Sequence, residues 1–186
     1  PSPAPIAAYE QPQSALVLID FQRDFLTPTG KMPVEPKQAL AVLENANKLI
    51  AWAKNRGSPI IVIGSEFKKS DWLNAFRNNA AVEGSAGALL DERLAKADSS
   101  AYFPKTKSDA FNNPDLEKFL IASKVDHLYI AGMYAEYCVY YTTEAAVRRK
   151  YRTTIASDGL ASKTDADLAK ALKKYASLGT GVVTTD

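Results

Sequence analysis

The chain has 186 residues, with 23 lysines and arginines against 21 aspartates and glutamates, for a formal net charge of +2. This length suits a single domain, and the balanced charge gives no broad basic field for nucleic acid or acidic lipid. A single cysteine excludes an intramolecular disulfide framework and a cysteine-based zinc site, and no apolar run approaches the roughly 20 residues of a membrane span. We therefore expect a small-molecule ligand, with neither nucleic acid nor membrane as a partner.

Residues 1–13 are rich in proline and alanine and show no periodicity, so we expect a flexible leader before a domain at residues 14–186. The chain does not begin with methionine. We expect a cytoplasmic protein, and an exported mature form stays open as the alternative.

Apolar runs alternate with segments of helical periodicity along the domain. The expected strands are 14–20, 59–64, 101–104, 125–131, 152–157 and 181–184, and the expected helices are 37–56, 88–95, 114–123, the segment that begins at Cys138, and 165–178. Segment 21–36 is expected to be a loop, and Gly57 is expected to end the first helix. This alternation predicts an α/β fold: a single doubly wound, Rossmann-like domain with a mostly parallel sheet of about six strands and helices on both faces.

Three ionisable residues fall where expected strands end. Asp20 closes the first strand, Lys105 follows the third, and Cys138 opens the helix after the fourth. Because ligands bind outside the carboxyl ends of the strands in such sheets, we expect these side chains to share one cleft. A thiol at a helix N-terminus beside a cation is expected to ionise readily, and a carboxylate can accept its proton.

The only histidine, His127, lies near the start of the fourth expected strand. At about 3.3 Å per residue, the rest of that strand places it roughly 16 Å from the edge that holds Cys138. A Cys–His dyad is therefore not expected, and we interpret His127 as structural. The sequence contains no G-x-S-x-G elbow, no G-x-G-x-x-G and no P-loop, which disfavours a serine triad and a nucleotide site.

Four segments in order carry a resemblance to a known family: LVLIDFQRDF at 16–25, VEGSAGALL at 82–90, FPKTKSDAF at 103–111 and AGMYAEYCV at 131–139. The set resembles the isochorismatase-like cysteine hydrolases, which include nicotinamidases and N-carbamoylsarcosine amidohydrolase. This resemblance implies a catalytic triad of Asp20, Lys105 and Cys138. It also implies a cis peptide bond between Met133 and Tyr134, and an oxyanion hole formed by the backbone N–H groups of Tyr134 and Cys138. Members of the family are often dimers or tetramers, so we expect a homo-oligomer. We expect no cofactor.

The chain departs from the family pattern at two places. The nicotinamidase branch has a D-x-H-x-x-H type metal site after the second strand, whereas segment 65–70 reads SEFKKS and lacks both histidines. We therefore expect no metal, and a site role for Glu66 stays undecided. The family often has Thr-Asp ahead of the cysteine, whereas this chain has Ala135-Glu136-Tyr137, so the family's familiar substrates do not carry over directly.

These observations predict a cysteine hydrolase that cleaves a C–N bond of a small amide or ureide through a thioester. Aromatic residues close to the cleft are candidate substrate contacts, namely Phe25, Phe67, Trp72, Tyr134 and Tyr137. Two alternatives stay open. One is an isochorismatase-type vinyl-ether hydrolase that uses Asp20 as its acid, and the other is a non-enzymatic small-ligand binding domain of the same fold.

Overall fold

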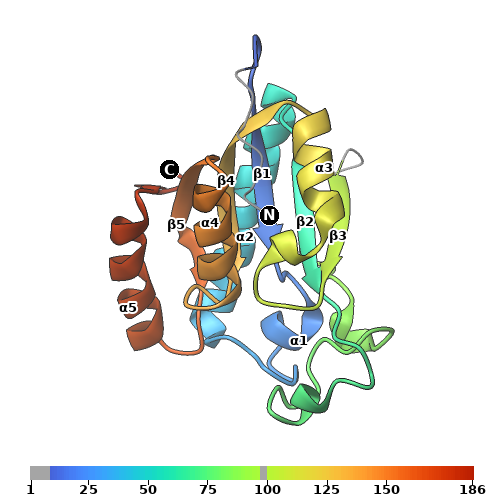
Figure 1. Cartoon of the computed structure of the whole chain (residues 1–186). Helices are drawn as coiled ribbons and strands as arrows, with labels where there is room; N and C mark the ends of the chain where they lie inside the picture. The colour runs from blue at the N-terminus through green and yellow to red at the C-terminus, as the bar shows by residue number, and fades with distance from the viewer. Residues whose placement is uncertain (1–8, 97–99) are drawn as a thin grey trace.

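A six-stranded parallel sheet forms the centre of the computed structural model, which describes residues 9–96 and 100–186 (Figure 1). Most of the predicted leader, residues 1–8, lies outside the described residues. The strands are β1 (Gln13–Ile19), β2 (Ile60–Ser65), β3 (Ser100–Lys105), β4 (Val125–Met133), β5 (Arg152–Ala161) and β6 (Gly181–Val183). Their order is β3-β2-β1-β4-β5-β6, and every neighbouring pair is parallel. The order is that of a doubly wound domain, which confirms the predicted fold class.

Helices cover both faces of this sheet, as predicted (Figure 1). Alternate residues of β1 enter two separate cores: Leu16 and Leu18 pack with α2 (Pro36–Arg56), while Val17 and Ile19 pack on the opposite side. That second core is formed with α3 (Pro114–Ala122), α4 (Cys138–Arg148) and α5 (Asp165–Tyr175). Burial of β1 on both faces explains why its sequence is one continuous apolar run. No helix in the described ranges is both long and apolar enough to cross a membrane.

The longest helix, α2, follows local sequence signals closely. The Glu35 side chain accepts a hydrogen bond from the Gln38 N–H at 2.9 Å, and Pro36 occupies the first turn, where its missing N–H costs nothing. Gly57 ends the helix with a left-handed φ of 64°. Its N–H donates to the carbonyls of Ala53 and Lys54, as a C-terminal glycine cap requires.

Two sequence predictions about the connecting segments are wrong. The expected loop 21–36 contains a short helix, α1 (Arg23–Leu26), and the expected helix 88–95 is irregular, following the 3-10 turn η2 (Ala86–Ala88). The physical reason for the second lies in tertiary pairing. Leu90 forms an isolated antiparallel bridge with Gln22, and the Asp91 N–H donates to the Phe21 carbonyl at 2.9 Å. The backbone here bonds to the segment after β1, so those groups are not available for a helix.

Three further 3-10 turns complete the chain: η1 (Trp72–Ala75), η3 (Ala110–Asn112) and η4 (Ala176–Leu178). The expected helix 165–178 is therefore α5 followed by η4. β4 and β5 each extend beyond the expected strands, to Met133 and Ala161 respectively.

The sheet reverses its winding between β1 and β4, and this is where a doubly wound fold binds ligands. Gly132 allows the two strands to approach there. It has a φ of 141°, and a Cβ atom at this position would lie only 2.2 Å from the Ile19 carbonyl oxygen. A larger residue would push the two strands apart immediately below the cleft.

Candidate active site

Asp20 is the first residue after β1, and its backbone turns sharply with a left-handed φ of 62°. Its N–H still donates to the Ile63 carbonyl at 2.8 Å, so the residue is fixed to the neighbouring strand β2. The side chain is almost fully buried, at 2% exposed. Asp20 therefore holds its carboxylate in a fixed position at the carboxyl end of β1, beside the point where the sheet reverses its winding.

Lys105 is the last residue of β3, two strands away from β1, and its side chain is fully buried. The Lys105 Nζ atom lies 3.0 Å from Asp20 Oδ2 and 3.2 Å from Cys138 Sγ. Cys138 is the first residue of α4 and is partly buried. The structure thus brings together the three residues that the sequence placed at strand ends.

Ser65 is a member of this cluster that sequence reasoning missed. Its hydroxyl donates to Asp20 Oδ1 at 3.0 Å and accepts from Lys105 Nζ at 2.7 Å. Because β2 lies between β1 and β3 in the sheet, its last residue, Ser65, sits between Asp20 and Lys105. The sequence signal that could have identified Ser65 was its position directly after the expected strand 59–64.

Gln22 supports Ser65 and was also missed. It is fully buried, its Nε2 donates to the Ser65 carbonyl at 2.7 Å, and its Oε1 accepts from the Ser65 N–H at 2.8 Å. A second bond from Nε2 reaches the Ala88 carbonyl at 2.7 Å. A buried amide that satisfies both of its ends in this way holds the Ser65 backbone rigidly.

The protonation states differ from the sequence-based expectation. Burial opposes the charged form of Lys105, but Asp20 and the Cys138 sulfur outweigh burial and raise the pKa of the ammonium. Burial is also the main effect on the thiol. Together with the Asp20 charge, and offset only in part by Lys105, it raises the pKa of Cys138 to about 12. The prediction of a readily ionised thiol is therefore wrong, because desolvation exceeds the helix N-terminus and the single cation.

The turn Tyr134–Tyr137 joins β4 to Cys138, and we call it the nucleophile turn. The Met133–Tyr134 peptide bond is cis. Within the described residues, the backbone N–H groups of Tyr134 and Cys138 donate to no protein acceptor. They are the two groups that the family resemblance assigns to an oxyanion hole, and both are available to donate hydrogen bonds to a ligand oxygen.

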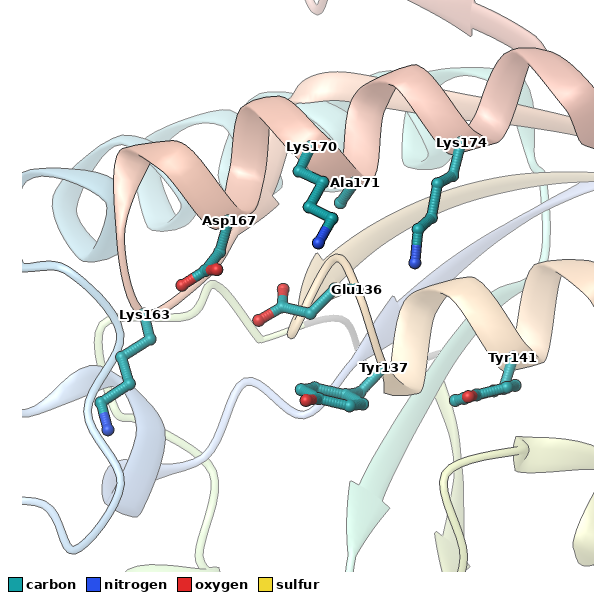
Figure 2. A pocket seen from close by; sticks show the side chains of 8 residues that line it. All are labelled: Glu136, Tyr137, Tyr141, Lys163, Asp167, Lys170, Ala171 and Lys174. Carbon is teal, nitrogen blue, oxygen red and sulfur yellow. The ribbon is translucent and has the colours of Figure 1, made fainter.

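Two pockets adjoin the nucleophile turn. One, of about 450 Å³, is mainly apolar and is lined by Lys31, Met32, Pro33, Phe76, Asn78, Tyr134, Glu136, Tyr137 and Lys163. The other, of about 320 Å³, lies between the turn and α5 and shares Glu136, Tyr137 and Lys163 with the first. Figure 2 shows Lys170 and Lys174 extending from α5 toward the side of this pocket that holds Glu136 and Tyr137.

The five aromatic candidates for substrate contact separate into three groups. Tyr134 and Tyr137 line the larger pocket. Trp72 is 74% exposed and packs edge-on against the pocket residue Phe76, with ring centroids 5.9 Å apart. Phe25 and Phe67 line neither pocket and belong to the core cluster that contains Tyr134. Both side chains are buried, and their contact with substrate stays a prediction.

His127 lies at the other end of β4, as expected. Its Nε2 atom is 2.8 Å from Thr154 Oγ1, and its ring packs against Tyr129 with centroids 4.4 Å apart. Burial lowers the pKa of the imidazole.

Glu66 accepts a hydrogen bond from the Tyr102 hydroxyl at 2.6 Å and takes no part in the Asp20–Lys105–Cys138 contacts. The part of the chain that the structure describes holds no cluster of three or more histidine, cysteine, aspartate or glutamate residues suited to a metal ion.

Comparison with known proteins gives a consistent result. The family model for the isochorismatase domain matches residues 14–186. N-carbamoylsarcosine amidase from Arthrobacter sp. is 25% identical over 61% of this chain and 47% of its own length, so this chain spans about half of that relative. A protein from Arabidopsis thaliana named probable inactive nicotinamidase is 27% identical over 81% of this chain and 82% of its own length. The crystal structure of an isochorismatase-like hydrolase from Alkaliphilus metalliredigens superposes with a TM-score of 0.86 at 24% identity, covering 94% of this chain and 96% of that one.

Proposed function

This chain belongs to the isochorismatase family of hydrolases, and from that premise we propose that it cleaves a C–N bond of a small amide or ureide through a thioester on Cys138. One observation carries the proposal: the Lys105 ammonium contacts both the Asp20 carboxylate and the Cys138 sulfur inside a buried cluster. A nucleophile, a proton acceptor and a fixed cation in contact are the groups that acyl transfer to a thiol needs.

The first half of the reaction follows from the protonation states. With a thiol pKa of about 12, little thiolate exists before substrate binds, so Asp20 takes the proton as the sulfur attacks the carbonyl carbon. A C–S bond forms, and the electron pair of the carbonyl moves to its oxygen, which accepts hydrogen bonds from the Tyr134 and Cys138 N–H groups. When this intermediate collapses, the C–N bond breaks and Asp20 returns the proton to the departing nitrogen.

The second half uses the same groups for water. Asp20 accepts a proton from water as the water oxygen attacks the thioester carbon, and the C–S bond breaks to release a carboxylic or carbamic acid. The sulfur regains its proton from Asp20. Lys105, whose pKa is raised, keeps its charge throughout and stabilises whichever of Asp20 and Cys138 is negative.

The pockets beside the nucleophile turn support a small substrate. A volume of about 450 Å³ lies within the range for small-molecule sites, and two residues of the turn that leads to Cys138, Tyr134 and Tyr137, line it. Asp20, Lys105 and Cys138 are not among its lining residues. The named amidase among the relatives acts on a small molecule of this class, which supports amide or ureide chemistry here.

The decisive experiment replaces Cys138 with alanine and screens both proteins against small carboxamides and ureides for release of ammonia or amine. Turnover by the wild type should fall by about a thousandfold or more in the variant. Hydroxylamine should trap an acyl group from the wild type alone. Undiminished turnover in Cys138→Ala would eliminate the thiol as nucleophile.

Two rival functions predict other outcomes. A vinyl-ether hydrolase that uses Asp20 as acid would release pyruvate from isochorismate and would resist thiol alkylation. A binding domain would bind ligand saturably and form no product, and the plant relative named as inactive is the observation that favours this reading.

A further inference from the structure

Tyr175, the last residue of α5, reaches the nucleophile turn from outside the triad. It is fully buried in the core that also holds Ala135 and Val139, and its hydroxyl donates to the Ala135 carbonyl at 2.5 Å. Burial raises the pKa of this hydroxyl, so it is protonated and can donate at neutral pH. A buried hydroxyl must find an acceptor, and this one lies in the middle of the turn, 40 residues away.

Ser162 reaches the same turn from the end of β5. It is fully buried, and its hydroxyl donates to Glu136 Oε2 at 2.6 Å. Its own backbone is anchored to the start of α2, because its N–H donates to Gln38 Oε1 at 2.8 Å and its carbonyl accepts from the Glu35 N–H at 3.0 Å. Ser162 therefore connects the turn to a long, well-packed helix.

Consecutive residues of the turn are fixed by these bonds. The Ala135 N–H donates to the Ala161 carbonyl at 2.9 Å, while its carbonyl accepts from Tyr175, and Glu136 is bound by Ser162. The residues that immediately flank this fixed pair are Tyr134 and Tyr137, and Cys138 follows. The N–H groups of Tyr134 and Cys138 therefore lie on either side of a segment whose position is set by one side chain from α5 and one from the residue that follows β5.

We infer that Tyr175 and Ser162 are positioning residues that hold the nucleophile turn so that the Tyr134 and Cys138 N–H groups converge on a reacting oxygen. The inference rests on the proposed function, in which those groups form the oxyanion hole. Within the described structure, no hydrogen bond joins either side chain to Asp20, Lys105 or the Cys138 sulfur. Their effect passes through the backbone, where a displacement of about 1 Å can cost roughly a hundredfold in rate.

Benzaldehyde is a suitable probe, because it reports the geometry of the turn without turnover. The Cys138 thiol adds to its carbonyl: a C–S bond forms, the thiol proton moves to the oxygen, and the oxygen of the resulting hemithioacetal takes the place of the oxyanion. Tyr175→Phe removes only the hydroxyl and should weaken benzaldehyde binding about tenfold, since a displaced N–H donor loses its hydrogen bond. Ser162→Ala should weaken it about threefold, because the backbone bonds of Ser162 remain.

Tyr151→Phe is the matched control. Tyr151 is also a buried tyrosine of the same core, but its hydroxyl makes no hydrogen bond within residues 9–96 and 100–186, so benzaldehyde binding should stay within about twofold of wild type. Alkylation of Cys138 by iodoacetamide is the second readout. That reaction displaces iodide at a saturated carbon and forms no oxyanion, so Tyr175→Phe should leave its rate within about twofold. A general loosening of the fold would change both reactions.

Unchanged benzaldehyde affinity in folded Tyr175→Phe and in Ser162→Ala would overturn the inference. Should Tyr175→Phe fail to fold, Ser162→Ala decides alone: a weakened affinity supports the inference and an unchanged one overturns it. Failure of the proposed function is seen separately, because wild type would then bind benzaldehyde no more tightly than Cys138→Ala does.

Discussion

The Lys105 Nζ atom lies 3.2 Å from the Cys138 sulfur, yet the thiol keeps its proton, because burial raises its pKa to about 12. The ammonium also lies 3.0 Å from Asp20, and one cation cannot fully compensate two anions in a buried site. Lys105 therefore stabilises a single negative charge. That charge lies on the Asp20 carboxylate while the sulfur is protonated, and on the sulfur when Asp20 holds the proton. This relationship leads to the first four predictions.

Alkylation of Cys138 by iodoacetamide should be slower at pH 8 than that of a free cysteine, whose pKa is about 8.5, because only the thiolate reacts. The rate should still be rising at about pH 10, since the pKa of this thiol is about 12. Mass spectrometry across a pH series measures the alkylation rate. A rate that levels off below pH 8 would contradict this prediction.

The raised thiol pKa also makes stability depend on pH. The stability that it contributes is present below pH 9 and is lost as the pH rises toward 12, so Cys138→Ala should reduce the alkaline loss of stability.

Asp20→Asn should change alkylation and turnover in opposite directions. The Asp20 charge is one of the causes that raise the pKa of Cys138, so its removal should lower that pKa and speed alkylation at pH 8. Turnover should fall by roughly a hundredfold or more, because the proton acceptor is gone. Asp115→Asn, on an exposed ion pair with Lys118, should change neither rate. Parallel losses in both assays would indicate damage to the fold instead.

Lys105→Met should destabilise the protein strongly. The substitution leaves the Asp20 carboxylate, whose side chain is 2% exposed, without its cation, and breaking a buried ion pair in this way costs about 3–5 kcal/mol. Lys118→Met is the surface control and should cost less than about 1 kcal/mol, since its pair with Asp115 is exposed. Urea unfolding measures both. The double variant Asp20→Asn/Lys105→Met should recover part of the loss, because it removes the unpaired charge as well.

Gly132→Ala should disrupt the sheet beneath the cleft. The added Cβ would lie 2.2 Å from the Ile19 carbonyl oxygen, in a backbone of φ 141° that side chains rarely adopt, so we expect a loss of at least about 2 kcal/mol. Gly57→Ala is the matched control. Its φ is 64° with no atom within 4 Å of the new Cβ, so only the left-handed backbone opposes it, at about 1 kcal/mol. Thermal unfolding distinguishes the two, and equal losses would show that the contact with Ile19 is unimportant.

Local patterns were sufficient for most of the architecture. The continuous apolar run of β1 and the helical periodicity of α2 depend on which residues become buried, and that follows from order along the chain. The end of α2 at Gly57 depends on the left-handed backbone that glycine adopts, which is also a local property. The meeting of Asp20, Lys105 and Cys138 could be anticipated for a related reason. Parallel strands bring their carboxyl ends to the same edge, whatever the side chains between them do.

The tertiary structure alone decided which groups surround those residues. The Ser65 bridge, the support from Gln22 and the bonds from Tyr175 and Ser162 to the nucleophile turn join residues that lie far apart in sequence. The irregular course of 88–95 has the same origin, since its backbone pairs with the segment after β1. The protonation of Cys138 is the clearest case. Position along the chain indicated a helix N-terminus and a nearby cation, but desolvation depends on all the atoms packed around the sulfur, and that packing exists only in the folded protein.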